Sequence, residues 1–196
     1  MDKKTFEKFR QLVYERSGIA LGPSKESLVA ARVGRRMRTL GIDSHDEYLE
    51  RVIDDQEGEE MVHLLDAIST NVTSFFRESN HFDFLAEVLG KWYAQGQRRF
   101  RLWSAASSSG EEPYSMAITV CETFGAAQFD VKILGTDIST RVLEKCLRAT
   151  YDEEKTKTVP APLRDKYFDV RREGDRKVCE ARPALRHRLR EPRAIR

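Results

Sequence analysis

The spacing of the apolar residues changes near residue 98. Before that point they recur every three or four positions, which is the period of an amphipathic helix. The stripes are Phe6, Phe9 and Val13; Leu28, Ala31 and Met37; Tyr48, Leu49, Val52 and Ile53; Met61, Leu64, Leu65 and Ile68; and Phe82, Leu85, Val88, Leu89 and Trp92. We therefore predict a small helical domain over residues 1–90.

After residue 98 the apolar runs are short, and strand-like runs alternate with helical ones. Residues 100–104 and 131–136 are typical of strands, whereas residues 113–124 and those that follow Ser139 have helical spacing. This order is typical of a parallel sheet with crossover helices. The predicted fold class is α/β, with a Rossmann-like domain over residues 91–196. Apolar residues become scarce after Phe168, so we expect this domain to be incomplete.

Composition limits the classes of protein to consider. Apolar residues make up 40% of the chain and charged residues 34%, which is typical of a globular protein. No apolar run approaches the roughly 18 residues of a membrane span, so we expect no membrane insertion. The three cysteines are widely spaced and form no metal-binding pattern, which indicates reduced thiols, a cytoplasmic location and no metal.

The basic residues are concentrated at the end of the chain. Residues 171–196 carry ten Lys and Arg against four acids, a net charge of +6. A basic tail can indicate nucleic-acid binding. This one has no aromatic residues for base stacking, so we expect no nucleic-acid partner.

The segment of residues 103–114 (WSAASSSGEEPY) joins the first predicted strand to a predicted helix. Its small residues allow a ligand to approach the backbone, and a helix start presents unpaired N–H groups. Glu111 and Glu112 would repel a phosphate there. A ligand with ribose hydroxyls and positive charge fits better, and S-adenosylmethionine is such a ligand.

Asp137 follows the second predicted strand directly. An acid at that position can accept hydrogen bonds from ribose hydroxyls. It can also stabilise the start of the next helix without any role in binding. The Gly110-Glu111-Glu112 turn upstream favours the ribose role.

The loop of residues 69–77 (STNVTSFFR) allows two interpretations. It can be a capped helix junction, with Thr73 or Ser74 as the cap and with Phe75 and Phe76 in the core. Alternatively, it covers a cofactor, with Asn71 and Thr73 bonded to polar atoms and Arg77 neutralising a carboxylate.

Four arginines gather on the second predicted helix, largely on the side away from its apolar stripe. They are Arg32, Arg35, Arg36 and Arg38. Such a run is usually a solvated face. It can also be a docking surface for an acidic helix or strand, where charge speeds the encounter and fixes the orientation.

Three segments carry a resemblance to a known family. They are residues 68–78 (ISTNVTSFFRE), 102–115 (LWSAASSSGEEPYS) and 133–140 (ILGTDIST). In order and spacing they resemble the chemotaxis receptor methyltransferases, the CheR family, which methylate glutamate side chains on bacterial chemoreceptors. Shorter matches continue to Tyr167-Phe168, so the resemblance covers most of the chain.

The resemblance implies a helical domain followed by a domain that binds S-adenosylmethionine, with S-adenosylhomocysteine as product. The implied cofactor contacts are Asn71, Thr73, Arg77, Glu111 or Glu112, and Asp137. The arginine-bearing helix would bind the cytoplasmic helical region of a chemoreceptor. A small β-subdomain at about residues 155–190 binds a receptor's C-terminal peptide in some members.

The resemblance weakens near the end of the chain. Members of the family continue with a strand that ends in Cys-Arg-Asn and with a Tyr-Phe pair, which this sequence lacks before Arg196. We therefore expect a truncated form of a protein-glutamate O-methyltransferase. The alternative is a receptor-binding module with impaired catalysis.

Overall fold

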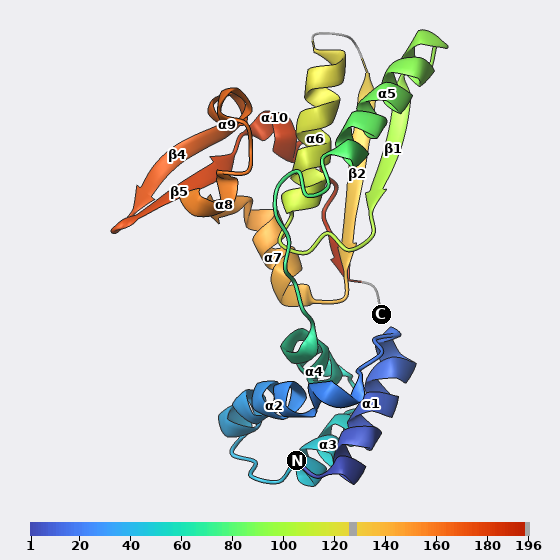
Figure 1. Cartoon of the computed structure of the whole chain (residues 1–196), viewed down its shortest axis with the longest axis vertical. Helices are drawn as coiled ribbons and strands as arrows, with labels where there is room; N and C mark the ends of the chain where they lie inside the picture. The colour runs from blue at the N-terminus through green and yellow to red at the C-terminus, as the bar shows by residue number, and fades with distance from the viewer. Residues whose placement is uncertain (126–128, 195–196) are drawn as a thin grey trace. The chain divides into compact units, whose positions relative to one another are not determined.

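The computed structural model describes residues 1–125 and 129–194, which form two compact units (Figure 1). The first contains Met1–Thr70 and Ile138–Thr140, and the second contains Asn71–Asp137 and the described residues from Arg141 to Ala194. The first unit therefore ends some twenty residues before the expected boundary at residue 90. The reason is that helix α5 (Asn80–Ala94), whose apolar stripe resembles the preceding ones, buries Leu89 in the core of the second unit.

The first unit consists of short helices. They are α1 (Lys3–Ser17), the 3-10 turn η1 (Pro23–Lys25), α2 (Glu26–Leu40), α3 (His45–Asp54) and α4 (Glu59–Ile68). Local sequence sets several of their ends: the Asp2 carboxylate accepts the Thr5 N–H at 2.8 Å at the start of α1, and Gly18 ends that helix at φ 71°. Such caps satisfy backbone groups that a helix end leaves unpaired.

Helix α2 buries a different face from the one predicted. Val29, Val33 and Met37 are 3% exposed or less, whereas Leu28 is 40% exposed and Ala31 is also exposed. The prediction for Leu28 and Ala31 was wrong. Both sets have helical spacing, and only the position of α3 and α4 decides which of two neighbouring stripes becomes core.

The second unit contains the predicted parallel sheet. Strands β1 (Arg99–Ser104) and β2 (Asp130–Asp137) pair in parallel, with Ser104 opposite Gly135, and β6 (Arg193–Ala194) pairs in parallel with the end of β2. Helices α5 and α6 (Glu111–Phe124) run beside these strands in Figure 1. The apolar core includes Phe100 and Ile133, so the predicted α/β class is confirmed.

A small antiparallel sheet follows helix α7 (Thr140–Arg148). Its strands are β3 (Thr150–Asp152), β5 (Arg176–Ala181) and β4 (Phe168–Glu173), in that order across the sheet. The short helices around it are α8 (Glu153–Thr156), α9 (Ala161–Tyr167) and α10 (Pro183–Arg186). This confirms the small β-subdomain that the resemblance implied.

None of the helices in residues 1–125 and 129–194 is both long and apolar enough to cross a bilayer. The three cysteines are free thiols, and Cys146 and Cys179 are buried.

Candidate functional site

The turn between β1 and α6 is fastened to the end of β2. The Ser107 N–H donates to the Thr136 carbonyl at 2.9 Å, and the Gly110 N–H donates back to the Ser107 carbonyl at 2.9 Å. Between the strands, the indole N–H of Trp103 on β1 donates to the hydroxyl of Thr136 on β2 at 2.9 Å. The carboxyl ends of two parallel strands and the start of a helix therefore meet here, which is where open α/β sheets bind ligands.

Gly110 is required at the start of α6 for two reasons. Its φ is 101°, a left-handed conformation that residues with a side chain rarely adopt. A Cβ atom there would also lie 2.7 Å from the Tyr151 hydroxyl and 2.9 Å from the Cys146 sulfur. Burial raises the pKa of the Tyr151 hydroxyl well above its usual value, so it stays protonated and donates to the Ser109 carbonyl at 3.0 Å.

The two glutamates of the turn have different surroundings. Glu111 is fully buried: Lys155 donates to one carboxylate oxygen at 2.7 Å, and the Ser109 hydroxyl donates to the other at 2.6 Å. Glu112 is exposed and accepts the Ser104 hydroxyl at 2.6 Å, at the carboxyl end of β1. Glu111 is thus held by two donors from the protein, and Glu112 is the one of the pair that solvent reaches.

Asp137 is the last residue of β2 and is 9% exposed. Its Oδ2 atom accepts the Ser108 backbone N–H at 2.9 Å. The carboxylate therefore shapes the turn that precedes α6, a role that the sequence did not suggest. Because a carboxylate can accept about four hydrogen bonds, this contact is compatible with binding a ribose hydroxyl as well.

The loop Asn71–Arg77 lies against this turn. The Ser108 hydroxyl donates to the Asn71 carbonyl at 3.2 Å, and the Phe76 N–H donates to the Ser115 hydroxyl of α6 at 3.0 Å. Phe75 is 1% exposed and packs edge-on against the Tyr151 ring at a centroid distance of 4.9 Å. The core position of Phe75 is confirmed, whereas the predicted cap at Thr73 or Ser74 was wrong, because α5 starts later, at Asn80.

The structure brings most of the expected cofactor contacts together within the second unit. Asn71 and Asp137 both form a hydrogen bond with Ser108. Glu112 is the second residue of α6, directly after the turn. Thr73 is half-buried in the same loop. Arg77 is exposed, and its guanidinium donates to the Val72 carbonyl of its own loop at 3.2 Å.

Two of the four α2 arginines have structural partners in the first unit. Arg32 donates to the Ile68 and Ser69 carbonyls, at 2.7 and 3.2 Å, where α4 ends. Cationic donors at that end satisfy unpaired carbonyls and oppose the negative end of the helix dipole.

Arg36 forms a two-bond ion pair with Glu60 of α4, at 2.9 and 2.7 Å, and the Tyr48 hydroxyl donates to the same carboxylate at 2.8 Å. Burial acts to raise the pKa of Glu60, but the hydrogen bonds from Arg36 and Tyr48 outweigh it and hold that pKa below its usual range. Of the four arginines, Arg35 and Arg38 are exposed, whereas Arg32 and Arg36 are half-buried.

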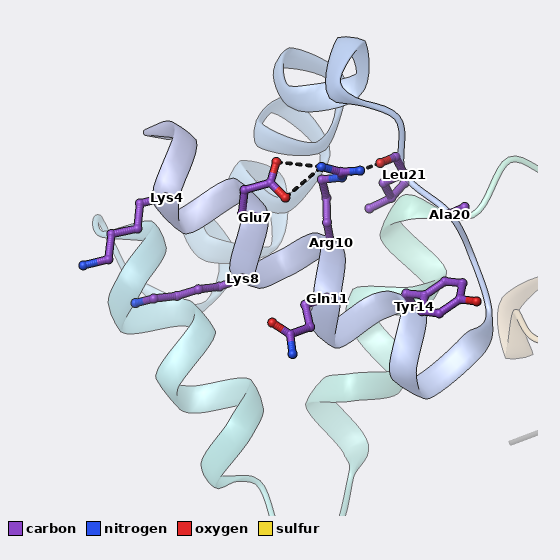
Figure 2. Close-up of a pocket in the computed structure, with 8 residues that line it drawn as sticks. All are labelled: Lys4, Glu7, Lys8, Arg10, Gln11, Tyr14, Ala20 and Leu21. Carbon is purple, nitrogen blue, oxygen red and sulfur yellow. Dashed lines mark hydrogen bonds and ion pairs between the residues drawn. The ribbon is translucent and has the colours of Figure 1, made fainter.

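A cavity of about 580 Å³ lies along α1 in the first unit (Figure 2). Its lining residues are Lys4, Glu7, Lys8, Arg10, Gln11, Tyr14, Ala20 and Leu21. Arg10 and Glu7 neutralise each other at 2.6 Å, and Arg10 also bonds to the Leu21 carbonyl. Lys8 and Gln11 bond outside this lining, to Asp46 and Glu15, so several of its polar groups already have partners in the protein.

Sequence reasoning missed Ser104, Ser108 and Lys155. The run Ser107-Ser108-Ser109 carried a signal, because small hydroxyl residues before a helix often bond to nearby acids. Lys155 carried none, since its partner Glu111 is 44 positions away. In residues 1–125 and 129–194 the structure contains no group of three metal-ligating side chains.

Comparison with known proteins agrees with this arrangement. Residues 71–188 match the model of the CheR methyltransferase SAM-binding domain, and residues 4–69 match that of the CheR methyltransferase all-alpha domain. The chain belongs to the CheR methyltransferase family. The two matched ranges also agree with the division after Thr70.

Several curated relatives are similar over most of the chain. It is 41% identical over 166 residues to chemotaxis protein methyltransferase 2 of Pseudomonas aeruginosa, which covers 85% of this chain and 58% of that protein. It is 39% identical over 163 residues to the chemotaxis protein methyltransferase of Salmonella typhimurium, covering 83% and 55%. The chain thus spans little more than half the length of these two relatives.

Proposed function

We propose that this protein methylates glutamate side chains of chemoreceptors, with S-adenosylmethionine as the methyl donor and S-adenosylhomocysteine as the product. One observation carries the proposal: the exposed Glu112 and the turn-bound Asp137 lie at the carboxyl ends of two paired parallel strands. Family membership and the names of the relatives, chemotaxis protein methyltransferases, support the same reaction.

The residues of the turn fit such a donor. In our proposal Asp137 accepts hydrogen bonds from the ribose hydroxyls, and Glu112 attracts the positively charged methionine end. Asn71, Thr73 and Arg77 contribute from the loop, where Arg77 pairs with a carboxylate. A phosphate-bearing ligand fits less well, because Glu112 stands in the first turn of α6.

Methyl transfer from a sulfonium to a carboxylate requires the protein mainly to bind and orient the two reactants. The donor supplies a methyl group on a sulfonium: a bond forms between this methyl and a glutamate oxygen while the sulfur–methyl bond breaks, and the electron pair stays on sulfur. A solvated glutamate has a pKa of about 4.3, so the nucleophile is ionised at neutral pH without a general base. We therefore assign no catalytic acid or base, and we attribute the rate to positioning and exclusion of water.

The receptor contacts belong to the same proposal. Arg35 and Arg38 are exposed on α2 and suit an acidic face in the cytoplasmic helical region of a receptor. Strands β3 and β4 are the edges of the small antiparallel sheet, so either could pair with a receptor's C-terminal peptide. We also propose a cytoplasmic location, because free thiols are typical of proteins in that reducing compartment.

The donor assignment is tested by titration calorimetry with S-adenosylhomocysteine. D137N should weaken binding by about tenfold or more, because an amide accepts fewer hydrogen bonds from the ribose than a carboxylate does. D130N is the matched control: Asp130 begins the same strand but pairs with Arg101 at 2.6 Å. Absence of binding by the unaltered chain would refute the donor assignment.

Methyl transfer itself is tested with methyl-labelled donor and a receptor cytoplasmic fragment. A glutamate methyl ester releases labelled methanol in mild base, whereas methyl groups on nitrogen remain bound. Label that resists base would contradict glutamate as the acceptor. A receptor fragment in which the acceptor glutamates are replaced by alanine is the matching control.

A further inference from the structure

We propose that Lys155 is a positioning residue for the methyl-donor site. It acts through the buried carboxylate of Glu111, which it neutralises, and so holds the turn before α6 in the conformation that binds the donor. This inference rests on the proposed function, because it concerns how the donor site is shaped.

The contacts form a continuous chain from Lys155 to Asp137. Lys155 and the Ser109 hydroxyl each bond to one oxygen of Glu111, at 2.7 and 2.6 Å. The adjacent residue, Ser108, donates its backbone N–H to Asp137 at 2.9 Å. Neighbouring residues of one turn thus bind two different carboxylates, so a change at Glu111 reaches Asp137 through a single peptide unit.

Lys155 is itself fixed by the small antiparallel sheet. It lies on α8, where the next residue, Thr156, is fully buried and has its hydroxyl oxygen 3.3 Å from the Cys179 sulfur of β5. The side chain of Lys155 is 48% exposed, whereas that of Glu111 is fully buried. Lys155 therefore connects the β-subdomain to the donor turn.

The accessible side of Lys155 borders a cavity of about 320 Å³. The cavity is lined by Ser109, Lys145, Arg148, Thr150, Tyr151, Asp152, Lys155, Glu173 and Val178. Water in this cavity can solvate the ammonium group, but the fully buried Glu111 has no such access. The two partners are thus unequal: water can solvate the charge of Lys155 when Glu111 is absent, whereas the buried charge of Glu111 is neutralised by Lys155.

This inequality has a physical consequence. Without Lys155, a carboxylate remains buried with one hydroxyl donor, which is strongly unfavourable. The turn must then shift until water or another donor reaches this carboxylate. That shift moves Ser109, and with it the Ser108 N–H that Asp137 accepts. Donor binding should therefore weaken.

The test compares the affinities of the unaltered chain and its variants for S-adenosylhomocysteine by titration calorimetry. K155M should bind about tenfold more weakly than the unaltered chain, because a carboxylate is left buried without its cation. K155M/E111Q should return to within about threefold, because no charge is then buried. E111Q alone should also stay within about threefold.

K166M is the matched control. Lys166 of α9 pairs at 2.7 Å with Glu122, which lies near the end of α6, whereas Glu111 begins that helix. K166M should bind like the unaltered chain. K155R, which keeps the charge, should retain most of the affinity. If K155M fails to fold, recovery of folding and binding in K155M/E111Q supports the inference, because only the buried charge has been removed; failure of both variants to fold overturns it.

The outcomes separate this inference from the proposed function. If the unaltered chain binds and K155M binds equally well, Lys155 has no positioning role. A loss that E111Q does not rescue would show that Lys155 contacts the ligand directly, which also overturns the inference. If the unaltered chain does not bind at all, the donor assignment fails, and the positioning role fails with it.

Discussion

Replacing Arg36 with methionine should destabilise the first unit by about 3 kcal/mol. Methionine keeps most of the packing of the arginine stem but removes both hydrogen bonds to Glu60. The Glu60 side chain is 7% exposed, so its carboxylate would remain buried with Tyr48 as its only donor from this network. Loss of one partner of a buried ion pair costs about 3–5 kcal/mol. The 24% exposure of Arg36 and the remaining Tyr48 bond place this case at the lower end.

The opposite substitution, E60Q, should cost less, about 1 kcal/mol. Arg36 is partly exposed and can turn its guanidinium to water, whereas Glu60 cannot escape burial. The expected order of the two variants therefore follows from exposure alone. R35M is the matched control, because Arg35 is the neighbouring exposed arginine of the same helix. It should change the stability by less than about 0.5 kcal/mol.

The R36M effect should also depend on pH. The pKa of Glu60 is lowered in the folded chain, so its contribution is complete above its unfolded pKa of about 4.3 and is lost as pH falls through the folded value. In R36M, burial would instead raise the pKa of Glu60, and stability would be lost as pH rises. The difference between the two chains should therefore grow between about pH 4 and pH 7.

The assay is hydrogen exchange of the helices α2 to α4 in the full chain, because two compact units need not unfold together. Peptides from the second unit provide an internal reference. If R36M and R35M protect these amides equally, or if E60Q is the more harmful change, the reasoning from burial is refuted.

Three further results are expected. G110A should lower the stability by about 3 kcal/mol in thermal unfolding, because of its φ and the 2.7 Å approach; G90A, in α5 with open space around it, should be neutral or stabilising. R32M should cost about 1 kcal/mol and speed hydrogen exchange at the end of α4, and unchanged exchange there would contradict the capping role. Burial, and then the charges of nearby acids, raise the pKa of Cys146 to about 12, so iodoacetamide at pH 8.5 should alkylate it only after denaturation; a labelled Cys146 peptide from the folded chain would disprove this.

Local patterns predicted the elements around the donor site well. The strand ending near Ser104, the turn of small residues and the helix with Pro113 in its first turn are all present. They depend on alternation, on small residues and on helix-start chemistry, which act over a few neighbouring positions. The loop at residues 71–77 was also expected at the site, although its fixation by Phe75 was only one of two interpretations.

The face of α2 and the boundary near Thr70 were beyond such reasoning. The set Val29, Val33 and Met37 and the set Leu28 and Ala31 satisfy the same helical period. The spacing of the apolar residues in α5 likewise does not indicate which of the two cores this helix packs against. A period specifies that a helix has an apolar face, but the partner that covers this face is chosen by distant segments.

The sequence by itself therefore determined the order of helices and strands, the family, and the small set of polar residues around one turn. Tertiary structure decided how those residues are used: Glu111 is buried against Lys155 while Glu112 is exposed, and Arg36 is committed to Glu60. These pairs lie 44 and 24 positions apart in the chain. Burial and ion pairing depend on what folding brings within about 4 Å, and no local pattern encodes that distance.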